Sequence, residues 1–202
     1  MKKTDKLRLM IAQEAAHIMY EEKIPEYRDA KRKAAKRFGS VEPLSLGSHL
    51  PSNAEIHREL QLLIGMFEEK VLPERLMFLR ILALRYMELF APFLPYLVGS
   101  VLTGVVTRQS DIDLHLFAES PEEVEQFLVE RKIPFESEVV SIRKGAEFFE
   151  YPHIYLEEDE VIIDCTVYHP EERRKRSISS ITGKAMELAD TKKLRRIVGE
   201  ML

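Results

Sequence analysis

Residues 110–117 alternate between polar and apolar side chains, and this feature constrains the fold of the chain more than any other. Alternate residues of a β strand point to opposite faces, so one face of this strand is apolar and the other carries Asp111, Asp113 and His115. The apolar face belongs to a hydrophobic core, whereas the acidic face stays outside it. The pattern therefore predicts a sheet that is packed on one side.

The first ninety residues follow a helical period instead. Apolar residues recur at helical spacing over 7–20 and 24–38, and a loop rich in Ser, Pro and Gly follows at 40–52. Helical patterns return after Ser52 and again after residue 72, until Pro92 and Pro95 end them. Beyond these prolines we expect strands at 96–98, 110–117, 135–149, 153–156 and 161–168, a helix at 121–132 and a helix at the C-terminus.

This order predicts an α/β (α+β) protein, with a mixed β-sheet flanked by helices and an all-helical region in front of it. We predict two parts, an N-terminal helical region at 1–92 and an α/β domain with a C-terminal helix at 93–202. The boundary falls where the helical period gives way to alternation.

Composition narrows the class of protein. The chain has 202 residues, of which 45% are hydrophobic and 32% charged, which excludes a disordered chain or a collagen-like fibre. A single cysteine excludes an internal disulfide and a cysteine-based zinc site. We find neither the apolar core of a secretory signal nor a membrane-spanning stretch, so we expect a cytoplasmic protein with no membrane partner.

The charge is uneven along the chain. Residues 1–50 carry eleven Lys or Arg against seven Asp or Glu, whereas residues 101–150 carry five against eleven. The net charge of −4 does not indicate a strongly basic nucleic-acid binder. An acidic stretch suits a cation-binding site, and a solvated acidic surface is the other interpretation.

Three carboxylates form the candidate site. Asp111 and Asp113 lie one step apart on a strand and repel each other, so a positive group is expected between them. Asp164 lies in the apolar strand pattern 161–167, where a buried carboxylate is costly unless it is paired or binds a metal. Oxygen ligands without thiolates favour a hard cation such as Mg²⁺. We therefore predict that these three residues lie together and bind metal.

A phosphate site is predicted beside them. Gly99 and Ser100 follow a short apolar strand and precede a helix, whose N-terminus favours anions. Glycine lets a phosphate approach the backbone, and serine offers a hydroxyl and an amide. A phosphate site next to metal-binding carboxylates suits phosphoryl or nucleotidyl transfer with two metal ions.

These residues resemble the DNA polymerase beta superfamily of nucleotidyltransferases. The shared pattern is a hydrophobic residue and Gly-Ser, a gap of about ten residues, Asp-hydrophobic-Asp-hydrophobic, and a later Asp on a strand. It is present here as Val98-Gly99-Ser100, Asp111-Ile112-Asp113-Leu114 and Asp164. The resemblance covers roughly residues 95–170 and does not extend to the helices before them.

The resemblance implies transfer of a nucleoside monophosphate from a nucleoside triphosphate to an acceptor, with release of pyrophosphate. By position, Asp111, Asp113 and Asp164 would be catalytic and would hold two Mg²⁺ ions, with Mn²⁺ as an alternative. Gly99 and Ser100 would hold the triphosphate. The acceptor (a nucleic acid, a protein or a small molecule) does not follow from the motif, and a catalytically inactive binding module of the same fold is the alternative.

Several polar residues extend this hypothesis. We assign nucleotide binding also to Arg108 and Ser110, in the loop before the first aspartate, and to Lys184. His115 shares the acidic face, either lining the site or as an ordinary strand residue. The basic cluster at 31–37 is either a solvated helix face or a surface for RNA or protein.

Overall fold

The computed structural model describes residues 3–22, 24, 26–38, 50–68, 72–107, 109–144, 147–174, 178–179 and 183–201. The chain divides into two compact units, Met1–Lys70 with Ile178–Lys184 and Val71–Ser177 with Ala185–Leu202. The predicted domain boundary lies at residue 92, whereas the second unit begins near residue 71. Helix α4 (Leu72–Leu89) accounts for the difference, because its apolar side packs on the sheet of the second unit.

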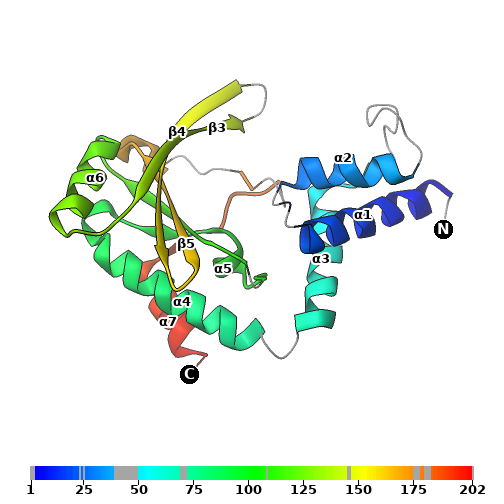
Figure 1. Ribbon diagram of the computed structural model, residues 1–202, viewed down its shortest axis with the longest axis horizontal. Helices are drawn as coiled ribbons and strands as arrows, with labels where there is room; N and C mark the ends of the chain where they lie inside the picture. The colour runs from blue at the N-terminus through cyan, green and yellow to red at the C-terminus, as the bar shows by residue number, and fades with distance from the viewer. Residues whose placement is uncertain are drawn as a thin grey trace. The chain divides into compact units, whose positions relative to one another are not determined.

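The first unit is built from three helices, α1 (Lys3–Glu21), α2 (Tyr27–Arg37) and α3 (Asn53–Glu68) (Figure 1). Its buried side chains come from all three and include Ile11, Ala15, Ile18, Ala30, Ala34 and Ile56. Ser52 and Glu55 form a capping box at the start of α3, since the Glu55 amide donates to Ser52 Oγ and the Ser52 amide donates to Glu55 Oε2. The first three helices of the predicted helical region thus form a small bundle.

The second unit contains a mixed sheet of six strands in the order β3-β4-β5-β2-β1-β6. Its strands are β1 (Tyr96–Leu97), β2 (Ile112–Phe117), β3 (Glu136–Lys144), β4 (Glu147–Glu158), β5 (Val161–Tyr168) and β6 (Ala189–Asp190). Only β2 and β5 run parallel to each other among these pairs. The predicted α/β fold with a mixed sheet is confirmed.

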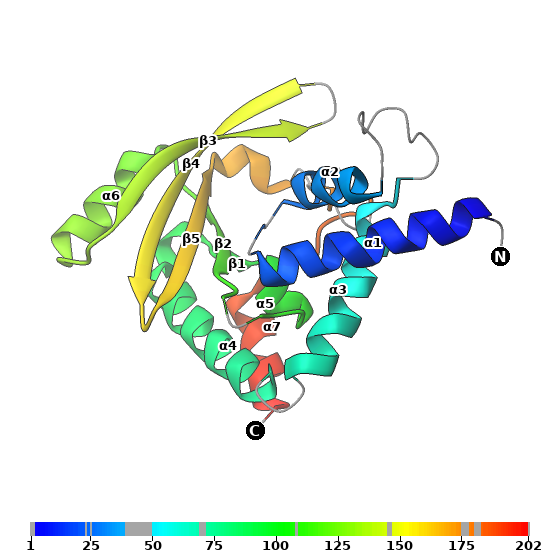
Figure 2. The same ribbon diagram turned by 45° about the vertical axis from the view of Figure 1, so that its right-hand side comes forward.

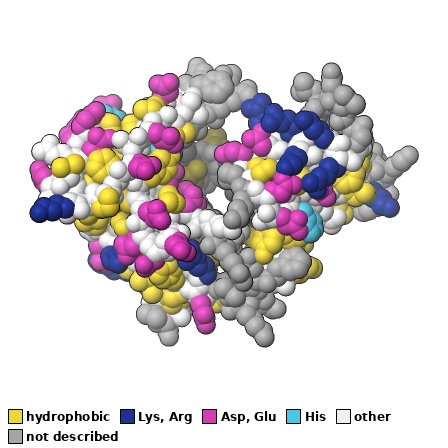
Figure 3. All heavy atoms as spheres, viewed as in Figure 1, with side chains coloured by type: hydrophobic (Ala, Val, Ile, Leu, Met, Phe, Trp, Pro, Cys, Tyr) yellow, Lys and Arg dark blue, Asp and Glu magenta, His cyan; other side chains and the backbone are white. Residues whose placement is uncertain are grey.

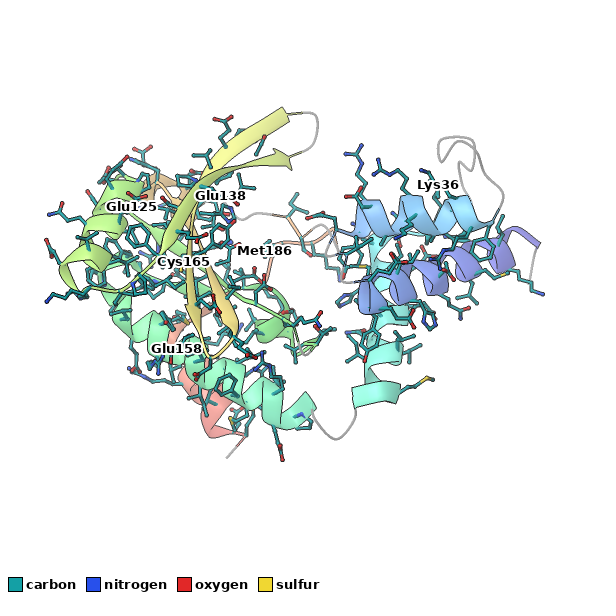
Figure 4. The ribbon with its side chains drawn as sticks, in the orientation of Figure 1. Lys36, Glu125, Glu138, Glu158, Cys165 and Met186 are labelled. Atoms are coloured by element: carbon teal, nitrogen blue, oxygen red, sulfur yellow. The ribbon has the colours of Figure 1, made fainter. Side chains whose placement is uncertain are left out.

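Helices cover one face of this sheet. Helices α4, α6 (Pro121–Glu130) and α7 (Thr191–Gly199) share a continuous core with the apolar side of the strands (Figure 2). The core includes Leu79, Phe90, Ile112, Leu114, Leu116, Leu128, Ile163 and Leu194. The alternation in β2 is fully expressed, because its even-numbered residues are buried and its odd-numbered residues are partly exposed. Cys165 lies in the core as a small buried residue (Figure 4).

Two features differ from the sequence prediction. Residues 135–149 and 153–156 were expected as separate strands, but they form one hairpin of β3 and β4, in which β4 runs without a break from 147 to 158. Strand β6 was not predicted, because two residues are too few to show a period. Along the described part of the chain, no helix has the length and apolarity that crossing a membrane requires.

Candidate active site

Three neighbouring strands bring the predicted residues together. Residues 99–103 form the short helix α5 directly after β1, so Gly99 begins that helix. The parallel pairing of β2 with β5 places Asp113 opposite Asp164. Since β1 lies on the other side of β2, Gly99 and Asp164 approach Asp113 from opposite sides.

Gly99 packs directly on the carboxylate of Asp113. Its φ of +69° is left-handed, a conformation that glycine adopts without strain. A Cβ atom added at Gly99 would lie 2.9 Å from Cγ of Asp113 and still closer to its Oδ2. The Val98 amide also donates to the carbonyl oxygen of Asp113 at 3.0 Å. Only glycine fits here, because any side chain would displace the carboxylate of Asp113.

The carboxylates disfavour one another's ionisation. Burial, followed by the nearby charges of Asp111 and Asp164, raises the pKa of Asp113 to about 8. Burial also raises the pKa of Asp111, with Asp164 again contributing. These shifts have the physical cause expected of carboxylates gathered in one place, and a bound cation would relieve them.

Asp164 has a partner that the other two lack in the described contacts. His153 on β4 lies with Nδ1 2.7 Å from Asp164 Oδ1. Tyr155 stands opposite Asp164 in the register of β4 and β5, and its hydroxyl donates to Glu138 Oε1 at 2.9 Å. Glu138 is on the edge strand β3 (Figure 4). His153 thus contacts Asp164 directly, and Tyr155 beside it is fixed by its hydrogen bond to Glu138.

Ser100 carries an unsatisfied hydroxyl. Its Oγ is buried and finds no hydrogen-bond partner among the described residues. Buried hydroxyl groups normally form hydrogen bonds, so a buried hydroxyl without one is a candidate to bind a ligand. The position of this hydroxyl, next to Gly99, fits the predicted phosphate site.

The other residues predicted to bind nucleotide or to line the site have fewer contacts that connect them to the three aspartates. Ser110 Oγ accepts a hydrogen bond from the Thr107 amide at 2.8 Å, so it shapes the turn before Asp111. Arg108 lies outside the described residues. Lys184 belongs to the first compact unit, and its assignment to nucleotide binding stays a prediction. His115 lies 3.5 Å, through Nε2, from the hydroxyl of Tyr168, and their rings are 4.7 Å apart.

The described residues contain no group of three or more His, Cys, Asp or Glu side chains arranged to hold a metal ion. Of the two carboxylate oxygens of Asp164, Oδ1 is engaged by His153. Metal binding by the three aspartates stays a prediction.

Residues 85–169 match the family described as the nucleotidyltransferase domain. The match supports a polymerase beta-like nucleotidyltransferase domain over this stretch. It includes Gly99, Ser100 and all three aspartates, whereas the helices of the first unit and Lys184 lie outside it. Among curated proteins, none matches the sequence.

Two residues near the candidate site were not singled out from the sequence. His153 had no metal-ligand spacing, and its partner Asp164 lies on the next strand, eleven residues away. Arg80 on α4 donates to the carbonyl oxygens of Val101 and Leu102, each at 3.1 Å, and so holds the end of α5. Both contacts depend on tertiary structure, and no local pattern signals them.

The basic cluster at 31–37 is largely engaged within the first unit. Lys and Arg side chains gather over α2 (Figure 3). Lys33 pairs with Glu22, and Arg37 pairs with both Glu14 and Glu22. Lys31 donates to Asn53 Oδ1 at 3.1 Å. These pairs favour the solvated helix face, and binding of RNA or protein there stays a prediction.

Proposed function

We propose that the nucleotidyltransferase domain transfers a nucleoside monophosphate from a Mg²⁺-bound nucleoside triphosphate to an acceptor hydroxyl and releases pyrophosphate. The observation that carries this proposal is the packing of Gly99 on Asp113. This packing places the start of α5, where an anion is favoured, beside a buried carboxylate that a cation would stabilise.

The order of strands suggests how the two substrates are arranged. The triphosphate would lie over α5, where Ser100 offers its unpaired hydroxyl. In-line displacement puts the attacking and leaving oxygens on opposite sides of the phosphorus. The acceptor would therefore approach from the β5 side, beside Asp164, because β1 and β5 flank β2 on opposite sides.

The donor set fits Mg²⁺. The three side chains are carboxylates, and burial and mutual repulsion raise the pKa of Asp111 and Asp113, as expected where a cation completes the site. When bound, two Mg²⁺ ions would neutralise the phosphate charge and stabilise the attacking and leaving oxygens. Asp111, Asp113 and Asp164 would hold these ions, and Mn²⁺ can take the same oxygen ligands.

The residues of this chain then have separate roles in the reaction. The acceptor oxygen forms a bond to the α-phosphorus while the bond from that phosphorus to the bridging oxygen breaks, and pyrophosphate leaves. The acceptor hydroxyl, which approaches beside Asp164, gives up its proton to the carboxylate of Asp164. Gly99 and Ser100 hold the phosphates in line for this displacement.

The test is calorimetric titration of ATP, GTP, CTP and UTP with Mg²⁺ into wild type and into the double variant Asp111→Asn/Asp113→Asn. We expect Mg²⁺-dependent binding of at least one nucleotide by wild type and a loss of at least tenfold in affinity in the variant. Asp159→Asn is the control, because it removes an exposed carboxylate in the turn between β4 and β5. Absence of binding by wild type, or equal binding by wild type and double variant, would refute the nucleotide site.

The same material separates the inactive alternative from an enzyme. A catalytic domain releases pyrophosphate when nucleotide and a suitable acceptor are present, and Asp164→Asn lowers that release. A binding module retains the nucleotide affinity of wild type but releases no pyrophosphate with any nucleic acid, protein or small-molecule acceptor tested.

A further inference from the structure

A buried histidine stands behind the third aspartate. His153 lies on β4 with 8% of its surface exposed, and Thr166 opposite it on β5 is buried to the same extent. These two are the buried polar side chains among the described residues. A polar group in such a place costs free energy unless its hydrogen bonds are satisfied, so its contacts indicate its role.

The contacts of His153 are asymmetric. Nδ1 lies 2.7 Å from Asp164 Oδ1, whereas Nε2 lies 3.5 Å from Thr166 Oγ1. An ionised Asp164 accepts hydrogen bonds only, so Nδ1 carries the proton and donates it. Nε2 faces the Thr166 hydroxyl at the longer distance. The short contact is therefore the one to the carboxylate.

This contact crosses the sheet diagonally. In the register of β4 and β5, His153 is opposite Thr166, and Asp164 is opposite Tyr155. Tyr155 is tied to Glu138 through its hydroxyl, and its ring centroid lies 6.0 Å from that of His153. Tyr155 thus limits the space into which the imidazole can turn. His153 is held by its strand and its neighbours, and it fixes one oxygen of Asp164.

We propose that His153 is a positioning residue for Asp164. This inference rests on the proposed function, because it takes Asp164 to be a metal ligand. By engaging Oδ1, His153 fixes the rotation of the carboxylate and leaves Oδ2 for the cation. Hydrogen bonds to ligating groups commonly account for ten- to a hundredfold in metal affinity.

The test is Mn²⁺ binding by the full chain in the presence of ATP, followed by electron paramagnetic resonance of free Mn²⁺. We compare wild type, His153→Phe, His153→Asn, His153→Gln and Asp164→Asn. The amide of Asn places a donor near the position of Nδ1, whereas the amide of Gln places it near Nε2. We expect His153→Phe and His153→Gln to weaken Mn²⁺ binding about ten- to a hundredfold and His153→Asn to remain within about threefold of wild type.

The Asn and Gln variants decide the question even if His153→Phe does not fold, because both keep a polar amide in the sheet. His57→Phe is the control, since His57 is a half-buried histidine that pairs with Tyr27 in the first unit. In an Asp164→Asn background, His153→Phe should cause no further loss, because its effect passes through Asp164.

Two results would overturn the proposal, and they differ in scope. If Asp164→Asn weakens Mn²⁺ binding but His153→Gln and His153→Asn both bind as wild type does, only the role of His153 is refuted. If Asp164→Asn itself binds Mn²⁺ as wild type does, the metal site of the proposed function fails at Asp164 as well.

Discussion

Gly99 lies against the carboxylate of Asp113 so closely that any side chain at residue 99 would displace it. The two residues are on adjacent segments, since α5 follows β1 and β1 pairs with β2. A backbone in the left-handed region and a carboxylate of raised pKa thus meet at one point of the sheet. This relationship links the fold of the domain to its candidate site.

Gly99→Ala should therefore be much more harmful than a glycine replacement elsewhere. The left-handed φ alone costs about 1–2 kcal/mol for alanine, and the contact with Asp113 adds to it. Gly104→Ala is the matched control, because Gly104 has φ +85° but its added Cβ would meet only ordinary contacts at 3.6 Å. We expect Gly99→Ala to lower the free energy of unfolding, measured in urea, by at least twice as much as Gly104→Ala. Equal losses would mean that residue 99 has room.

Ser100→Ala should separate function from stability. The buried Oγ of Ser100 has no hydrogen-bond partner in the described structure, so removing it relieves a desolvation cost of about 1 kcal/mol or more. We expect an unchanged or higher free energy of unfolding together with weaker binding of Mg²⁺ and nucleotide.

Ser110→Ala is the comparison for this variant. Ser110 Oγ accepts from the Thr107 amide, so its loss should lower stability by about 1 kcal/mol. Urea unfolding and calorimetry on both variants make the comparison. A Ser100→Ala protein that is less stable than wild type and binds nucleotide equally well would contradict the assignment.

The sequence was sufficient for the aspartates and the glycine, because strand alternation and spacing are local properties. Asp113 lies on the outward face of β2 as its position predicts, Asp111 directly precedes that strand, and Asp164 lies opposite Asp113 on β5. The pairing of β2 with β5 is a tertiary feature, yet the apolar pattern around Asp164 indicated that this carboxylate needed a partner.

Contacts between segments far apart in the chain could not be predicted from the sequence. His153 and Arg80 act on Asp164 and α5 from other elements, and neither has a local motif. The hairpin of β3 and β4 was missed for a related reason. The described side chains of β3 are largely exposed on both faces, so the alternation that identifies a strand is weak there.

Arg80→Met should loosen α5 and the residues that begin it. Arg80 donates to the carbonyl oxygens of Val101 and Leu102, and losing both bonds leaves two carbonyls without this donor. We expect a loss of about 1–3 kcal/mol in the free energy of unfolding and weaker nucleotide binding. Arg195→Met is the control, because its pair with Glu88 is exposed and such pairs contribute about 1 kcal/mol or less. The expectation fails if the two variants lose the same stability.

The pH dependence of the free energy of unfolding should show that Asp113 has a raised pKa in the folded protein. Its pKa is raised to about 8 in the folded protein, so the folded state retains a proton that the unfolded state has released above about pH 4. The free energy of unfolding of wild type should therefore fall as the pH rises from about 4 to 8. Over this range the unfolded state is stabilised by releasing the proton of Asp113, whereas the folded state retains it.

Asp113→Asn removes this cost, since asparagine carries no charge at any of these pH values. In buffer with a metal chelator, we expect the variant to be clearly more stable than wild type at pH 8 and nearly equal to it at pH 4. Urea unfolding at the two pH values measures this gap, and Asp159→Asn reports the effect of removing an exposed carboxylate. Adding Mg²⁺ at pH 8 should narrow the gap from the wild-type side, because a cation stabilises the ionised carboxylate. A gap of the same size at both pH values would show that Asp113 does not titrate in this range.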